Sequence, residues 1–295
     1  MSENENKFQD YVTFPRTFEK YKWYKPLITI VFVMILFIVF QVILALVFKT
    51  IYGDAVLNSI MDGGYETLNT TDASVYFSYL SIAVFIPIIY IASRIFRDRP
   101  FSSYASSRGG WNWKIYFKCL LIPLITYLVF NIISLLMGKE TGSNSQVSVI
   151  ALVLSLILIP FQCIAEEYVF RGLLMQSFGS WFKIPILAII IQALIFAAVH
   201  PYNSLGVIAI GFSGIVYGLL AWRTNGLEAG AAIHSINNLM AFYTVALGLT
   251  SISSSLSFWD FFTDILLTLV TAIVLYYIGN KKGWFDEKTP EGKLF

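Results

Sequence analysis

Apolar residues recur along this chain in eight long runs, separated by short stretches that carry most of the charged residues. Runs of roughly 16–25 apolar residues have the length at which an α-helix crosses the hydrocarbon core of a bilayer. Backbone groups in hydrocarbon must be hydrogen-bonded within their own segment, so each run predicts a helix rather than a strand. The predicted spans are Leu27–Phe48, Val75–Phe96, Trp113–Met137, Val147–Cys163 and beyond, Ile184–Val199, Leu205–Trp222, Leu227–Leu247 and Phe261–Ile278.

This pattern predicts an all-α polytopic membrane protein, a bundle of about eight transmembrane helices that forms one domain. Residues 1–26 are expected to form a cytoplasmic N-terminal segment, 27–279 the membrane domain and 280–295 a cytoplasmic C-terminal tail. The polar residues that suggest chemistry fall within residues 147–248. No internal repeat is visible in the sequence, which argues against a transporter built from two related halves.

The composition agrees with lipid as the main solvent. Hydrophobic residues make up 57% of the 295 residues, charged residues make up 13%, and the mean hydropathy is +0.70. Soluble domains carry about a quarter charged residues, because their water-facing surface has to be polar. The net charge of +2 gives no indication of a nucleic-acid partner, so membrane lipid is the expected partner.

The cysteines and the N-terminus argue against a secreted, disulfide-linked protein. Cys119 and Cys163 both lie in apolar runs, where they are expected to be buried thiols, and two cysteines are too few for a zinc knuckle. The first ten residues are polar and acidic, without the apolar stretch of a cleavable signal peptide. The first span is therefore expected to remain as a membrane anchor.

Basic residues mark the segments that are expected to face the cytoplasm. The first loop carries only Lys49 among four acidic residues, whereas the N-terminus and the second loop are strongly basic. The basic residues on the expected cytoplasmic side are Lys7, Arg16, Lys20, Lys22, Lys25, Arg94, Arg97, Arg99, Arg108, Lys114, Arg223, Lys281 and Lys282. This alternation predicts an even number of spans in a cell membrane, with both termini in the cytoplasm.

Charged residues at the depth of the hydrocarbon core are costly, and each is therefore a candidate for function. Glu166, Glu167 and Arg171 follow the apolar run of the fourth span. Glu167 and Arg171 are four residues apart on one helix face, so they can pair. Glu166 points about 100° away with no cationic partner in its own helix, an environment that suits a general base. The alternative is a helix end at the interface, with all three charges in water.

The two histidines of the chain both lie in predicted spans or at their ends. His200 ends the fifth span, four residues after Phe196, and His234 lies in the seventh span, four residues before Asn238. Either histidine alone is typical of a buried core residue, and Asn238 alone is typical of a hydrogen bond between helices. Together with the glutamate pair, they are hard to explain as packing.

A hairpin of the fourth and fifth spans would hold Glu166 and His200 level, because each lies 17 residues from Lys183. Hydropathy alone disagrees, since it puts Glu166 near the cytoplasmic end of its span and His200 near the outer end of its own. Kinks at Pro160 and Pro201 could reconcile the two. The sequence leaves open which face of the membrane the site would open toward.

A possible serine-protease pattern occurs in the sixth span. Gly211, Ser213 and Gly214 match the G-x-S-G of rhomboid-type proteases, with His234 available as a base. Gly214 and Gly218 also form a small-xxx-small face, the common device for close helix packing in lipid, and packing is the favoured interpretation. The serine-protease interpretation would also leave the charged residues of the fourth span unexplained. Neither H-E-x-x-H nor G-x-G-D occurs in the sequence.

Three motifs occur in order along the chain: Glu166-Glu167-x-x-x-Arg171, Phe196-x-x-x-His200 and His234-x-x-x-Asn238. They resemble the signature motifs of the CPBP or Abi family, which comprises CAAX-type and bacteriocin-processing intramembrane proteases. The resemblance covers about Pro160 to Phe242 and holds at each motif position. It implies an eight-helix bundle with a conical internal cavity and endopeptidase activity.

Carried over by position, the resemblance implies a role for each motif residue. Glu166 and His200 would activate the attacking water. His234 and Asn238 would stabilise the oxyanion through N–H groups. The implied supporting residues are Glu167, Arg171 and Phe196.

The resemblance leaves the cofactor open, because the family is often labelled as metalloproteases. Glu166, His200 and His234 could hold zinc with water as a fourth ligand. Zinc would then occupy the base and an oxyanion donor, so a metal-free glutamate mechanism is the favoured alternative.

The expected function is an intramembrane endopeptidase that cuts a peptide or protein substrate at the membrane. The family includes prenyl-CAAX proteases and proteins that process, or confer immunity to, bacteriocins or peptide pheromones. The alternative is a non-proteolytic bacteriocin-immunity factor or membrane scaffold, which would use the same residues to bind a peptide without cutting it. By analogy alone, the size of the chain suits a bacterial plasma membrane.

Overall fold

The computed structural model describes residues 9–62, 71–137, 146–250 and 255–287, and within them the chain is helical with two isolated β-bridges. Each of the eight apolar runs forms a helix. The long helices are α1 (Lys25–Tyr52), α4 (Asp72–Ala83) continued by α5 (Phe85–Phe96), α7 (Trp113–Leu136), α8 (Val149–Glu167), α10 (Pro185–Ala198), α11 (Ser204–Thr224), α12 (Glu228–Ala246) and α13 (Phe258–Lys281). The short helices are η1 (Phe14–Thr17), α2 (Asp54–Asp62), α6 (Ser102–Ala105), η2 (Tyr168–Met175), α9 (Gln176–Phe182) and η3 (Trp284–Asp286). The all-α polytopic bundle expected from the sequence is confirmed.

Six helical stretches of the described residues are long and apolar enough to cross a membrane. The two remaining runs, α10 and α12, differ from these six for separate reasons. Helix α10 is apolar but has only 14 residues, and α12 has 19 residues but carries buried polar side chains such as Glu228 and His234. Polar residues are tolerated at this depth where protein rather than lipid surrounds them.

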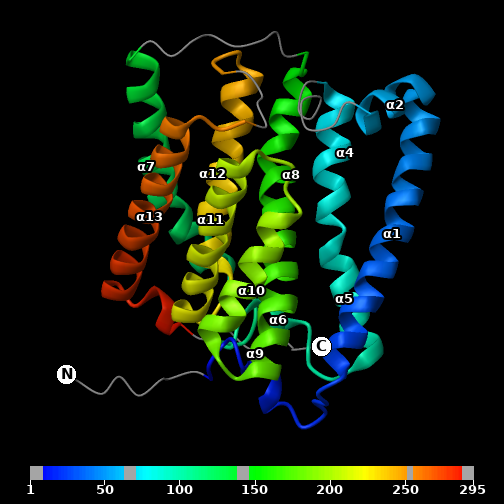
Figure 1. Ribbon diagram of the computed structural model, residues 1–295, viewed down its shortest axis with the longest axis vertical. Helices are drawn as coiled ribbons and strands as arrows, with labels where there is room; N and C mark the ends of the chain where they lie inside the picture. The colour runs from blue at the N-terminus through cyan, green and yellow to red at the C-terminus, as the bar shows by residue number, and fades with distance from the viewer. Residues whose placement is uncertain (1–8, 63–70, 138–145, 251–254, 288–295) are drawn as a thin grey trace.

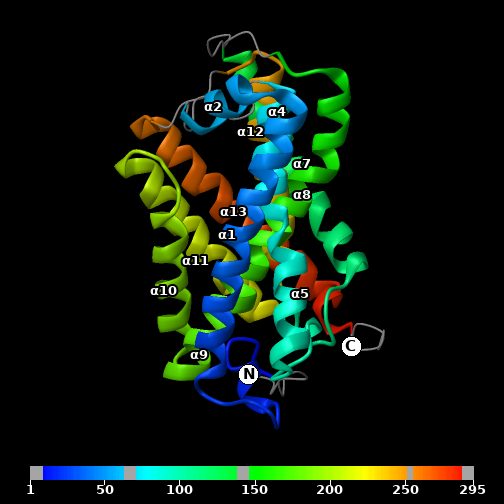
Figure 2. The ribbon, with the colours of Figure 1, turned by 90° about the vertical axis from the view of Figure 1, so that its right-hand side faces the viewer.

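Helix α12 lies inside the bundle, where it packs against α7, α8, α11 and α13. Helix α10 packs on α11, and α4 packs on α8, while α1 reaches the bundle mainly through α5 and α4. Figure 1 shows α7 and α13 on one side, α1 and α4 on the other, and α8, α11 and α12 between them; Figure 2 shows α10 beside α11. The most polar of the long helices is therefore the one that its neighbours shield best.

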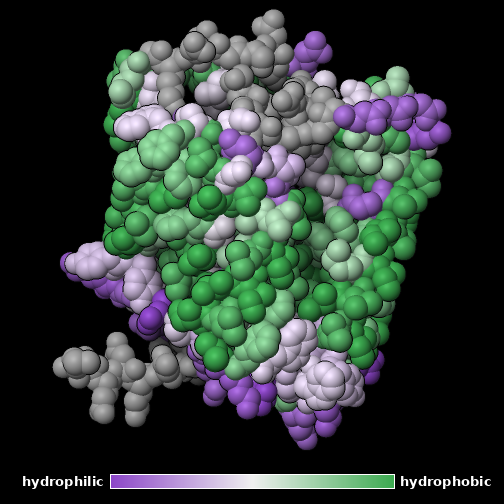
Figure 3. All heavy atoms as spheres, viewed as in Figure 1, coloured by the Kyte–Doolittle hydropathy of each residue, from purple (hydrophilic) through white to green (hydrophobic). Residues whose placement is uncertain are grey.

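On the face seen in Figure 3, a band of apolar side chains covers the middle of the bundle, and polar residues gather toward its two ends. Helix α1 contributes most, because only 6% of its most apolar window is buried. An exposed apolar surface of this extent requires a lipid environment, since soluble proteins rarely expose large apolar patches.

The N-terminal segment packs against one end of the bundle. The hydroxyl of Tyr11 donates to the carbonyl of Tyr104 at 2.6 Å, and the indole N–H of Trp222 donates to Asp10 at 2.7 Å. Burial raises the pKa of Tyr11 well above its usual value, so its hydroxyl keeps the proton that it donates. The segment before α1 is thus fixed to α6 and to the end of α11.

A buried ion pair fixes the start of α12. The Nη2 of Arg108 lies 2.5 Å from Oε2 of Glu228, and both side chains are fully buried. The other oxygen of Glu228 accepts the backbone N–H of Asn112 at 2.9 Å. Because a buried charge is tolerated only with its partner, these contacts hold the loop before α7 against the helix that carries His234.

Candidate active site

The motif residues come from one continuous helical stretch and two neighbouring helices. Helix α8 runs directly into η2, a π-helix, and then α9, so that residues 149–182 form one stretch of 34 residues. π-helical turns are rare and often occur at functional sites. This stretch carries Glu166, Glu167 and Arg171, α10 carries Phe196, and α12 carries His234 and Asn238.

This continuity resolves the conflict over the depth of Glu166. Hydropathy suggested that the fourth span ends near Glu166, but the helix continues to Phe182, and Glu166 lies near the middle of it. The predicted turn is present, because Lys183 has a left-handed backbone (φ 59°) and α10 begins at Pro185. The carboxylate therefore lies inside the bundle and not at its surface.

Glu167 and Arg171 form the ion pair that their spacing predicted. The Nη1 of Arg171 donates to Oε1 of Glu167 at 3.0 Å, and both side chains are fully buried. The Nη2 donates to the carbonyl of Gly214 at 3.2 Å, and the guanidinium lies 4.6 Å from the ring centre of Phe196. Through these contacts, the buried guanidinium of Arg171 joins the fourth span to α10 and α11.

His234 lies between the two glutamates. Its Nδ1 is 3.1 Å from Oε1 of Glu167, its Nε2 is 3.4 Å from Oε2 of Glu166, and its ring stacks on Tyr217 at 5.4 Å. A carboxylate only accepts hydrogen bonds, so the nitrogen facing Glu167 carries a proton. A second proton has to lie between Nε2 and Glu166 for that contact to be a hydrogen bond. Glu166 thus has an imidazole partner, supplied by another helix.

Glu166 is buried, with 8% of its surface exposed, and its two oxygens have different surroundings. Its Oε1 accepts from Nε2 of Gln162 at 2.6 Å, one helical turn earlier. Its Oε2 faces His234 but has no hydrogen-bond partner within the described residues. This arrangement leaves one carboxylate oxygen able to accept from water.

Gln162 is a site residue that the sequence interpretation missed. Besides donating to Glu166, it accepts at Oε1 from Nδ2 of Asn238 at 3.3 Å and from the thiol of Cys163 at 3.3 Å. An uncharged amide in an apolar run is only weak evidence for a site residue. The sequence feature that could have identified Gln162 is its position four residues before Glu166, on the same helix face.

His200 follows the end of α10 and is half-buried. Its Nδ1 lies 2.6 Å from the carbonyl oxygen of Phe196, and its ring packs on the Phe196 ring at 4.6 Å. The same phenylalanine ring lies 6.0 Å from that of His234, so Phe196 is next to both histidines. Among the described contacts, Glu166 is joined to His234 and not to His200.

The suggested zinc ligands do not form a metal site in this structure. Both nitrogens of His234 face carboxylates, and Nδ1 of His200 faces a carbonyl oxygen of its own helix. No group of three or more His, Cys, Asp or Glu side chains in the described part of the chain could hold a metal ion. These residues therefore do not fit the tetrahedral ligand set of zinc.

The glycines of the sixth span serve helix packing, as favoured from the sequence. A Cβ on Gly214 would lie 3.0 Å from the Cβ of Ala193, and one on Gly218 would lie 3.0 Å from Ile189, both on α10. No hydrogen bond joins Ser213 to a histidine in the described residues. The G-x-S-G pattern is therefore part of the α10–α11 contact.

Comparison with known proteins agrees with this site. Residues 147–240 match the family described as Type II CAAX prenyl endopeptidase Rce1-like, and the matched segment contains all three motifs. This segment is therefore similar to the CAAX prenyl endopeptidases. The similarity favours a membrane endopeptidase activity of the CAAX-protease kind.

Similarity to a curated protein extends beyond this segment. The chain is 25% identical over 229 residues to the uncharacterized protein YyaK of Bacillus subtilis (strain 168), covering 70% of this chain and 76% of that protein. A search of the solved structures found no match. Because YyaK is uncharacterized, this similarity adds neither an activity nor a substrate.

Proposed function

We propose that this protein is an intramembrane endopeptidase in which Glu166 activates a water molecule for attack on a peptide bond. The observation that carries this proposal is the buried carboxylate of Glu166, which has one oxygen held by Gln162 and the other without a hydrogen-bond donor. A carboxylate fixed in this way is suited to accept a proton from water as a general base.

In this proposal, His234 is the partner of Glu166. The Arg171–Glu167 pair fixes the His234 ring through its Nδ1 and so directs Nε2 at Glu166. An orienting carboxylate of this kind is a recurrent means of holding a catalytic imidazole. With Nε2 protonated, His234 can donate a hydrogen bond to the oxyanion when a substrate is bound.

His200 is proposed as a second base on the α10 side. The carbonyl oxygen of Phe196 can only accept, so Nδ1 of His200 is the nitrogen that carries the proton. In the neutral ring, Nε2 then has a free electron pair and can accept a proton from water or return one to the leaving amine. Asn238, now bonded to Gln162, is proposed as the second oxyanion donor.

The proposed substrate is a peptide or protein segment at the membrane. The name of the matched family points to prenylated C-terminal peptides. The resemblance of the three motifs to bacteriocin-processing proteases suggests unprenylated ones. Both kinds of peptide belong in a test of activity.

The test is cleavage of a peptide library by the purified protein in detergent, with prenylated and unprenylated members. Glu166→Gln removes the base without changing the size of the side chain. General-base catalysis contributes about 10²–10⁴-fold, so we expect the rate to fall by at least about a hundredfold. Mass spectrometry of the products gives both the rate and the bond cut.

The matched control is Glu287→Gln, which makes the same chemical change at a half-buried position outside the three motifs, where the carboxylate pairs with Lys118. It is expected to cleave as the wild type does. Full cleavage by Glu166→Gln would refute the proposed base, and loss of cleavage on chelation with recovery on added zinc would refute the metal-free mechanism. A wild type that binds library peptides and cuts none would favour the immunity or scaffold function.

A further inference from the structure

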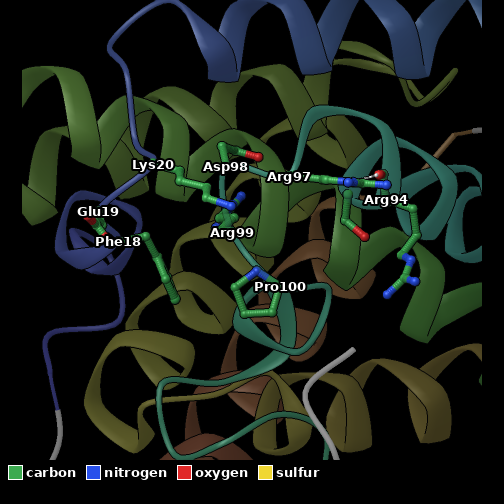
Figure 4. A pocket seen from close by; sticks show the side chains of 9 residues that line it. Phe18, Glu19, Lys20, Arg94, Arg97, Asp98, Arg99 and Pro100 are labelled. Atoms are coloured by element: carbon green, nitrogen blue, oxygen red, sulfur yellow. Dashed lines mark hydrogen bonds between the residues drawn. The ribbon is translucent and has the colours of Figure 1, made fainter.

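A cavity lies outside the candidate active site, at the end of the bundle where the N-terminal segment packs. It has a volume of about 590 Å³ and is lined by residues 18–20, which precede α1, and by residues 93–94 and 97–100 at the end of α5 and the following turn. None of the three motifs contributes to it. Figure 4 shows its lining side chains.

The cavity carries an excess of positive charge. Four of its lining residues are cationic (Lys20, Arg94, Arg97 and Arg99) and two are acidic (Glu19 and Asp98). Lys20 and Arg94 are exposed and form no ion pair within the described residues, so their charges are available to a ligand. Figure 4 shows Lys20 near Asp98 and Arg99, with Arg94 and Arg97 on the other side.

Arg99 is held in place by the protein itself. Its guanidinium donates to the side-chain oxygen of Gln176 and to the carbonyl of Gly172, and it lies 3.5 Å from the ring centre of Tyr104. Arg99 therefore provides a fixed, buried positive charge in the cavity, whereas the side chains of Lys20 and Arg94 are exposed.

Asp98 supplies a second and independent indication of a ligand. It lines the cavity with only 4% of its surface exposed, and its Oδ1 is buried without a hydrogen-bond partner in the described residues. Buried carboxylate oxygens nearly always have a donor, because leaving one unsatisfied is costly. A ligand that brings a hydroxyl group next to the cationic side chains would supply that donor.

The cavity also lies at the depth of lipid headgroups. Helix α5 ends at Phe96 and α1 begins at Lys25, so the cavity is just beyond the apolar part of both helices. Trp23 and Tyr24, which directly precede α1, are exposed, as is typical of residues at the membrane interface. Basic pockets between membrane helices at this level are suited to the headgroups of anionic lipids.

We propose that this cavity binds a phosphodiester that carries free hydroxyl groups, as does the headgroup of phosphatidylglycerol. Lys20 and Arg94 contact the phosphate oxygens, with Arg99 behind them, and Asp98 accepts a hydrogen bond from a headgroup hydroxyl. The site is separate from the proposed proteolysis, and its occupation does not require that the protein be a protease.

The test is titration of the full-length protein in a neutral detergent with short-chain phosphatidylglycerol, followed by calorimetry. Lys20→Gln/Arg94→Gln removes two exposed charges and is expected to weaken binding by at least about tenfold, since each contributes electrostatically to phosphate binding. The matched control is Lys281→Gln/Lys282→Gln, which removes two exposed charges at the end of α13. It is expected to bind within about twofold of the wild type.

Comparison ligands test which chemical groups the cavity recognises and whether its ligand is a lipid or a soluble phosphate. Short-chain phosphatidylcholine, which lacks the net charge and the hydroxyls, is expected to bind at least about tenfold more weakly. Equal affinity for the two lipids, or unchanged binding by Lys20→Gln/Arg94→Gln, would overturn the proposal. Glycerol 3-phosphate and inorganic phosphate form the soluble arm: glycerol 3-phosphate binding as tightly as the lipid would support the chemistry with a soluble source. Inorganic phosphate binding equally well would overturn the role of Asp98.

Discussion

At the scale of single residues, Gln162 connects the two helices that carry the candidate site. Its amide donates to Glu166 on α8 and accepts from Asn238 on α12. Because an amide offers a donor and an acceptor at once, one side chain can fix both the proposed base and a proposed oxyanion donor. Gln162 therefore acts through its neighbours and not on substrate.

Gln162→Leu is expected to lower the turnover number while leaving the protein folded. A hydrogen bond to a charged group is worth about 1.5–3 kcal/mol, which corresponds to a loss of about ten- to a hundredfold in kcat. KM should stay within about twofold, because the proposed role is in positioning the base.

The control for this prediction is Gln41→Leu. Gln41 on α1 donates to the carbonyl of Ser81 at 2.7 Å, far along the chain from the motifs. Both variants lose one amide of the same size, so thermal unfolding and peptide cleavage can be compared directly. If both lower kcat equally, or if Gln162→Leu changes only KM, positioning of Glu166 is the wrong explanation.

At the scale of elements, the contact between α10 and α11 places Phe196 and Arg171 in the site. Gly214 allows this approach because it has no Cβ. Its carbonyl accepts hydrogen bonds from both Arg171 and Gln192. An alanine Cβ there would lie 3.0 Å from the Cβ and 3.1 Å from the Cα of Ala193. The helices would have to move apart by a few tenths of an ångström.

Gly214→Ala is therefore expected to destabilise the protein relative to Gly211→Ala. Both substitutions gain the same helix propensity, about 1 kcal/mol, and lie on the same helix. A Cβ on Gly211 meets only an ordinary contact, 3.5 Å from Ala197, whereas overpacking at Gly214 costs about 1–3 kcal/mol.

The measurement is thermal unfolding of both variants in the same detergent. We expect a lower Tm for Gly214→Ala than for Gly211→Ala, together with slower cleavage. Equal melting temperatures would show that α10 and α11 do not depend on this close approach.

At the scale of the whole molecule, the apolar band and the two polar ends set how the bundle lies in a membrane. The N-terminal segment, the end of α5 and η3 lie toward one end, and α2 lies at the other (Figure 1). The positive-inside rule predicts that the first of these ends faces the cytoplasm. The same end holds the proposed phosphodiester cavity.

Labelling of single cysteines in intact cells tests this orientation. Asn58→Cys, exposed on α2, is expected to react with a membrane-impermeant thiol reagent, whereas Thr17→Cys, exposed in η1, should react only after permeabilisation. Cys119 and Cys163 are buried, so the parent protein serves as an unreactive control. The reverse labelling pattern would place α2 in the cytoplasm and the N-terminal segment outside the cell, contrary to the prediction.

The sequence by itself determined the helices, the membrane environment and the identity of the charged motif residues. Hydropathy and helical spacing are local properties, and the solvent constrains each span separately. The Glu167–Arg171 pair could be predicted for the same reason, since four residues of helix fix its geometry. The packing of Gly214 and Gly218 followed from the same kind of local pattern.

Only the tertiary structure decided which residues meet across helices. Glu166 and His234 are 68 residues apart, and their contact depends on how α8 packs against α12. The extension of α8 through η2 was hidden, because the charged residues after Cys163 resemble a span end when hydropathy is averaged. Gln162 was hidden because an amide becomes informative only when its partners are known. Distances between helices arise from side-chain packing, and no local pattern encodes them.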